Sequence, residues 1–104
     1  MSHTPLDPYV TDVLMPDLVG HERSPSAFVV YLYLWRQTIG RRRTAIRASY
    51  QTIATETGLS KAGAQRAVAI LKRRKLLSAV AGGPVAVPRY RVVRPWIGRL
   101  PPAE

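Results

Sequence analysis

The 104-residue sequence has no cysteine, few acidic side chains and no apolar run near the length that spans a bilayer. Without cysteine, the chain can form neither a disulfide framework nor a thiolate metal site. A membrane-spanning helix needs an apolar run of about 18 residues, and the N-terminus lacks the basic-then-apolar pattern of a secretory signal. We therefore expect one domain, cytoplasmic and soluble, with no membrane partner.

Residue types that support catalysis or metal binding are also scarce. Both histidines, His3 and His21, lie in the first 22 residues, and the rest of the chain has neither paired carboxylates nor a Gly-rich phosphate loop. His3 and His21 could bind a metal together with Asp7 or Asp17, but a solvated pair of histidines is the preferred interpretation. We expect no enzymatic activity, no metal and no cofactor.

Positive charge is abundant and unevenly placed. The formal net charge is +10, and residues 1–22 contain no Lys or Arg. Residues 23–104 carry all sixteen cations against only Glu56 and Glu104, a net charge of +14. Such a basic body attracts polyanions, and counterion release from nucleic acid is the usual source of affinity. The acidic residues of the first segment are Asp7, Asp12, Asp17 and Glu22.

Residues 1–22 form an acidic N-terminal extension that three prolines interrupt, at Pro5, Pro8 and Pro16. Its apolar content is too high for a disordered tail, and we expect one short helical turn over residues 11–15. The segment could dock on basic surface and compete with a polyanion. It could instead only cover an apolar face of the next helix, which is the interpretation we favour.

The first strong helix is expected to begin at Ser24 and Pro25, a capping residue followed by proline at the first helical position, and to end before Gly40. Its circumference is apolar almost all round, so burial on more than one side is expected. One side can meet the N-terminal segment, a second subunit, or both. The residues expected at a dimer interface are Val29, Val30, Tyr33 and Leu34.

Residues 49–71 are typical of two helices joined by a tight turn. Ser49 can cap the first helix and Ser60 the second, because each hydroxyl can accept from a free backbone N–H. Gly58 lies where the first helix must end, and glycine adopts a left-handed φ without steric penalty. Small residues, Ala54 and Ala64, are expected where the two helices cross.

Strands are expected on both sides of these helices, at residues 44–48, 76–80 and 89–94. Gly82-Gly83-Pro84 predicts the turn of a hairpin, or wing, formed by the last two strands. Tyr90 should face the core, and Arg89 and Arg91 should face outward. Trp96 is interpreted as a packing residue rather than a base-stacking one. The domain therefore covers residues 23–97, followed by a tail at 98–104.

This order of elements resembles the winged helix-turn-helix superfamily, and in particular small bacterial and plasmid- or phage-type DNA-binding proteins. The similarity lies in Ser-Tyr-x-Thr-Ile-Ala-x-x-Thr-Gly-Leu-Ser at residues 49–60 and in Leu-Lys-Arg-Arg-Lys-Leu-Leu at residues 71–77. It covers about residues 25–96. The resemblance implies a mainly α fold with a small β-wing, in which the second helix of the motif enters the major groove of DNA.

The outward face of that helix carries the expected base contacts. Arg66 suits a guanine edge, Gln65 an adenine edge and Ala62 a thymine methyl group, with Lys61 beside them. Gly63 either permits close approach of the DNA backbone or is simply tolerated. Arg89 and Arg91 would lie over a flanking groove or the backbone. The expected phosphate contacts are Arg41, Arg42, Arg43, Ser49, Tyr50, Ser60, Lys72, Arg73, Arg74 and Lys75.

These features predict a sequence-specific double-stranded DNA-binding protein, associated with the nucleoid. A homodimer is expected because one recognition helix reads few base pairs. With no room for a sensor domain, it would act by site occupancy as a transcriptional regulator or repressor, without a small-molecule effector. The alternatives are a plasmid or phage replication or partition factor, and a nonspecific architectural DNA-binding protein.

Overall fold

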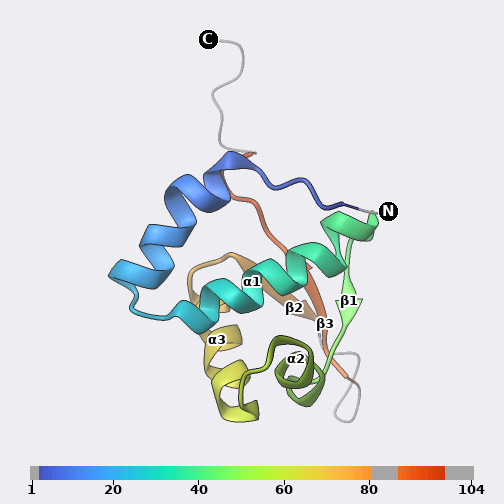
Figure 1. Ribbon diagram of the computed structural model, residues 1–104. Coiled ribbons are helices and arrows are strands. Elements are labelled where there is room, and N and C mark those ends of the chain that lie inside the picture. The colour runs from blue at the N-terminus through green and yellow to red at the C-terminus, as the bar shows by residue number, and fades with distance from the viewer. Residues whose placement is uncertain (1–2, 81–86, 98–104) are drawn as a thin grey trace.

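The computed structural model describes residues 3–80 and 87–97 and is mainly helical, with a small antiparallel sheet (Figure 1). This confirms the expected fold class at that level. The expected turn at residues 82–84 and the tail at 98–104 lie outside the described residues. Within the described part, no helix is long and apolar enough to cross a membrane. In chain order, the elements are η1 (Val10–Leu14), η2 (Pro16–His21), α1 (Pro25–Gln37), η3 (Ile39–Arg41), β1 (Ile46–Arg47), α2 (Tyr50–Thr57), α3 (Lys61–Arg73), β2 (Leu77–Val80) and β3 (Arg89–Val92).

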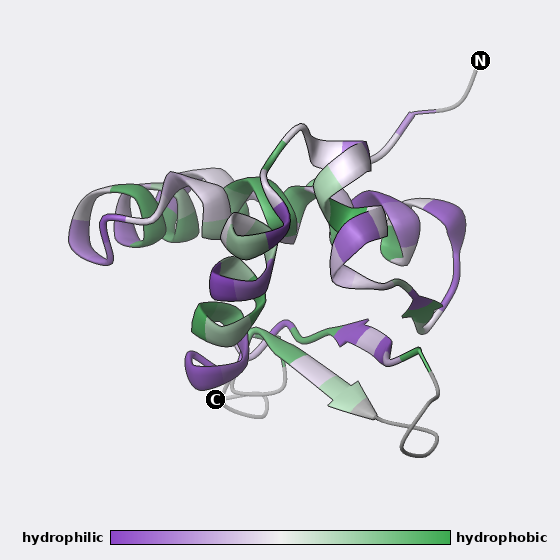
Figure 2. Cartoon of the chain, turned by 90° about the horizontal axis from the view of Figure 1, so that it is seen from below, coloured by the Kyte–Doolittle hydropathy of each residue, from purple (hydrophilic) through white to green (hydrophobic). Residues whose placement is uncertain are grey.

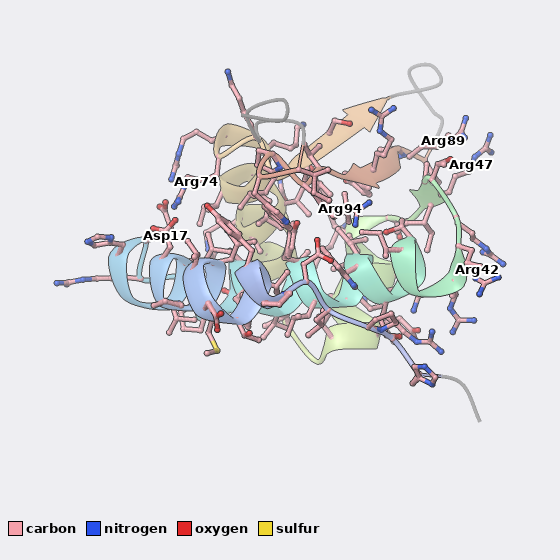
Figure 3. The ribbon with its side chains drawn as sticks, turned by 90° about the horizontal axis from the view of Figure 1, so that it is seen from above. Asp17, Arg42, Arg47, Arg74, Arg89 and Arg94 are labelled. Carbon is pink, nitrogen blue, oxygen red and sulfur yellow. The ribbon has the colours of Figure 1, made fainter. Side chains whose placement is uncertain are left out.

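The three strands lie in the order β1-β3-β2, and both pairings are antiparallel. Figures 2 and 3 show the helices on one side of this sheet. The side chains alternate accordingly: Leu77 and Tyr90 are buried at 3% and 1% exposure, whereas Arg89 and Arg91 are exposed, as expected. The sheet therefore has an inner face in the core and an outer face that no described helix covers.

The N-terminal segment is more ordered than the single expected turn. η1 and η2 follow one another through Met15, whose backbone is also helical, with wide i→i+5 hydrogen bonds such as Met15 N–H to the Val10 carbonyl. Val10, Leu14 and Leu18, at a spacing of four residues, are 0%, 4% and 0% exposed. They belong to the same hydrophobic core as the rest of the chain. Residues 1–22 therefore have no separate core and contribute to the core formed with residues 23–97.

The same segment also reaches the two tryptophans. The Trp35 indole N–H donates to the Pro5 carbonyl at 3.0 Å, and the Trp96 indole N–H donates to the Asp7 carboxylate at 3.1 Å. The Tyr9 ring stacks on Trp96 with centroids 4.5 Å apart. Trp96 is therefore a packing residue, as expected, and the beginning and end of the described chain meet through it.

α1 begins where the sequence indicated. The Ser24 hydroxyl accepts from the Ala27 N–H at 3.2 Å, with Pro25 at the first helical position. The expected dimer interface needs correction, because Val30 and Leu34 are both 0% exposed within the single chain. Their neighbours are the chain's own elements, including the N-terminal segment and α3, which pack on α1. The other two expected interface residues, Val29 and Tyr33, are exposed and half-buried respectively.

Candidate nucleic-acid interface

α2 and α3 are joined by the tight turn that the sequence predicted. The Ser49 hydroxyl accepts from the Thr52 N–H at 3.0 Å, and the Ser60 hydroxyl accepts from the Gly63 N–H at 2.9 Å. Gly58 adopts φ +84°, a left-handed conformation that a Cβ atom would strain. At the turn, Gly58 thus ends α2 and the Ser60 cap begins α3, while the Ser49 cap fixes the start of α2.

One face of α3 is buried and the opposite face is open. The inner face is apolar, and none of its four core residues is more than 1% exposed: Ala64, Ala67, Val68 and Leu71. The outer face near the helix start carries all four expected base contacts, and each is exposed. We call this set the α3 stripe: Lys61, Ala62, Gln65 and Arg66.

Gly63 lies on the buried side of α3 rather than in the stripe. A Cβ atom at this position would lie 3.1 Å from the Ser60 Oγ and 4.0 Å from the Leu59 Cβ. Glycine therefore leaves room for the capping hydroxyl. This local packing gives a reason for Gly63 that does not involve DNA.

Basic residues at the C-terminal end of α3 form ion pairs with carboxylates of the N-terminal segment. The Arg73 guanidinium lies 2.6 Å from one Glu22 oxygen, and the Arg74 guanidinium lies 3.0 Å from the other. Arg74 also forms an ion pair with Asp17, which Figure 3 shows beside it at one end of the molecule. Two of the expected phosphate contacts thus have protein partners. Lys72 and Lys75, from the same run, are exposed.

The hydrogen bonds from Arg73, together with those from Arg74, hold the pKa of the Glu22 carboxyl below its ordinary value of 4.5. Because the pKa is lowered in the folded state, the ion pair stabilises the fold fully above the unfolded pKa, and the contribution is lost as pH falls through the folded pKa. We expect Glu22→Gln to lose less stability than wild type between about pH 7 and about pH 3. Urea unfolding at the two pH values measures this difference.

The matched control for that experiment is Glu56→Gln, at an exposed carboxylate on α2. No ion pair involving Glu56 is recorded in the described part of the chain. This variant should keep the pH dependence of the wild type. An equal pH dependence in wild type and Glu22→Gln would contradict the role given to the ion pairs.

The expected phosphate contacts at residues 41–43 lie at the opposite end of the molecule from Arg74. Figure 3 places Arg42 with Arg89 there, far from Arg74. The structure adds Arg47, which the sequence prediction missed, because β1 pairs Arg47 directly with Arg89. Alternation of side chains along β1 is the signal that could have found it. The exposed arginines of this end and of the adjoining strand are Arg41, Arg42, Arg43, Arg47, Arg89 and Arg91.

Two further expected contacts, Ser49 and Tyr50, are half-buried and have partners within the chain. Ser49 is the cap of α2, and its hydroxyl also donates to the Thr52 hydroxyl at 3.0 Å. Tyr50 is half-buried. Burial, with the neighbouring Tyr50, raises the pKa of Tyr90 to about 12. The Tyr50 side chain packs against the hydrophobic core, to which Tyr90 belongs.

No metal site is evident in the part of the chain that the structure describes, where no three His, Cys, Asp or Glu side chains converge. His21 lies 3.7 Å from Asp17, whose carboxylate also binds Arg74. Comparison with models of known protein families, with curated proteins and with solved structures finds no match to this chain. The case for a function therefore depends on the surfaces described above.

Proposed function

We propose that this chain is a sequence-specific double-stranded DNA-binding protein of the winged helix-turn-helix class. The observation that carries the proposal is the α3 stripe, a set of exposed polar and small side chains on a helix whose other face is fully buried. The turn before α3 is rigidly capped, so the stripe is held in a fixed orientation. A helix presented in this way suits the major groove of B-DNA.

Each residue of the stripe has a chemical role in this proposal. The Arg66 guanidinium can donate two hydrogen bonds to a guanine edge, and the Gln65 amide can pair with an adenine edge. Ala62 is small enough to meet a thymine methyl group. Lys61, with Ser60 and the backbone N–H groups at the start of α3, suits phosphate.

Two copies of the chain are part of the proposal, because a single α3 reads few base pairs. The buried positions Val30 and Leu34 are not available for pairing. Exposed apolar side chains remain at Val29 on α1 and at Val13 and Val19 on the N-terminal helices, which are 38–40% exposed. A dimer of this kind would act by occupying a near-palindromic site, as a transcriptional regulator or repressor.

The test is a selection of bound fragments from random duplexes, with wild type and with Arg66→Ala. We expect the wild type to enrich one motif and the variant to lose discrimination at one base pair by about 1–3 kcal/mol, or about 5- to 150-fold. Arg66→Lys separates two roles, since lysine keeps the charge but not the paired hydrogen bonds of the guanidinium. It should therefore also lose the base preference.

Gln51→Ala is the matched control for Gln65→Ala, because both are exposed glutamines on the adjacent helices α2 and α3. Only Gln65→Ala should change the motif. Failure of the wild type to enrich any motif would refute specific binding and favour the nonspecific architectural alternative. An unchanged motif for Arg66→Ala would refute the role of Arg66.

A further inference from the structure

Three arginines project from the outer face of the sheet. The strand register pairs Arg47 with Arg89 and places Arg91 opposite Ser78. Directly paired residues have Cβ atoms about 5 Å apart, and two residues on the same face of one strand are about 7 Å apart. The three side chains therefore leave the same face of the sheet from neighbouring positions, and all three are exposed.

This cluster is unfavourable for the isolated protein. Like charges directly opposite one another destabilise a pair of strands, and Arg47 and Arg89 are such a pair. Within residues 3–80 and 87–97, the recorded ion pairs of arginines involve Arg73, Arg74 and Arg94, but none of the three arginines in this cluster. A bound anion would remove the repulsion.

The positions of these arginines suit a row of phosphate groups better than a single phosphate. Arg42 extends the charge beyond the sheet at the same end of the molecule (Figure 3). A hollow in front of the strands adds hydroxyl groups, and its lining is Thr44, Ala45, Ser78, Arg89 and Arg91. Duplex DNA carries one negative charge per about 1.7 Å of its axis, so it can match several of these cations together.

The chemistry of this face favours a duplex over a single strand. Sheets that bind single-stranded nucleic acid use exposed aromatic rings, on which bases stack. The aromatic residue of β3, Tyr90, is 1% exposed and faces the core. The side chains described on the outer face are arginine and serine, which suit phosphate rather than bases.

We infer that the outer face of the sheet, through Arg47, Arg89 and Arg91, binds the backbone of a second duplex while the α3 stripe holds the first; the inference rests on the proposed function of α3. The helices lie on the inner side of the sheet (Figure 2), and the outer face is directed away from them. Each chain then contacts two DNA segments, one through the α3 stripe and one through the sheet, and the protein bridges them. This replaces the expected position of Arg89 and Arg91 on the same duplex as α3.

The test is a two-step capture. A duplex carrying the selected motif is immobilised, loaded with protein and washed, and a labelled duplex without the motif is then added. We expect wild type to retain the labelled duplex. Arg47→Gln with Arg89→Gln should load equally on the first duplex but capture much less of the second, and the salt slope of the remaining capture should be lower by about 2. Arg47→Lys with Arg89→Lys should keep capture, because the charges remain.

Each other outcome overturns the inference. Capture by the Gln variant equal to wild type would show that bridging uses another surface, such as a second copy of α3. Failure of the Gln variant to load on the first duplex would place the arginines in the same interface as the stripe. Preferential capture of a labelled single strand would identify a different ligand. The proposed function is tested separately. If the wild-type protein enriches no motif in the selection from random duplexes, the role of α3 is refuted, whatever Arg47 and Arg89 do.

Discussion

Replacing Leu18 by alanine is expected to lower the free energy of unfolding by about 2–5 kcal/mol, a large part of the roughly 5–15 kcal/mol that stabilises a domain. Leu18 is 0% exposed, in η2, and belongs to the single core. Its backbone carbonyl accepts from the Ser24 N–H at 2.8 Å, at the start of α1. Loss of its side chain leaves a cavity between the N-terminal segment and the core. Urea unfolding followed by circular dichroism measures the effect.

Met15→Ala is the matched control, because Met15 lies in the same helical path, directly before η2, and is 42% exposed. Its effect should stay within about 0.5 kcal/mol, as for most surface substitutions. Equal, small effects at both positions would show that the N-terminal segment is only loosely attached. The core would then be formed by residues 23–97 alone, within the domain bounds that the sequence predicts.

The local features of α2 and α3 could be predicted because each depends on a few neighbouring residues. A hydroxyl cap needs only the right residue before the helix, as at Ser49 and Ser60. A left-handed turn needs only glycine at the right position, as at Gly58. The exposed face of α3 follows from helical spacing once the buried residues are identified. The candidate site is therefore the part of the fold that sequence predicts best.

The N-terminal segment could not be predicted in the same way. Pro16 indicates a helix end, but a missing N–H is harmless at the first position of η2, so the helical path continues past it. The partners of Asp17 and Glu22 lie more than fifty residues later in the chain. Contacts at that separation depend on the tertiary fold. The sequence indicated an acidic segment beside a basic body but not which cations it would meet.

These ion pairs bear on both interpretations of the segment. Its apolar residues belong to the core, and η2 packs on α1, which is the packing role that we favoured. Its carboxylates also occupy Arg73 and Arg74, which is the docking on basic surface that we considered as the alternative. The structure thus contains both contacts together. In the proposed function, DNA affinity for the first duplex therefore comes from cations outside these ion pairs, such as Lys61 and Arg66 of the α3 stripe and the exposed Lys72 and Lys75.

Trp35→Ala is expected to lower the free energy of unfolding by about 3–5 kcal/mol. Trp35 is 1% exposed and lies beside Tyr31 and Trp96, with ring centroids 6.0 Å and 6.4 Å away. The Arg94 guanidinium lies over its ring at 5.7 Å. Its indole N–H holds the Pro5 carbonyl. One side chain on α1 therefore fixes both the N-terminal segment and the end of the described chain.

Tryptophan fluorescence makes the experiment specific, because the chain has only two tryptophans. In Trp35→Ala, Trp96 is the sole reporter, and its emission should shift toward that of a solvated indole as the stack loosens. Trp35→Phe keeps an aromatic ring but removes the N–H donor, so it should cost less stability than alanine. If the two variants unfolded at the same urea concentration as wild type, the stack would not be holding the two ends together. Trp35→Phe can also be tested in the DNA selection. If the variant is destabilised but enriches the same motif as wild type, the stack supports the fold without affecting the α3 stripe.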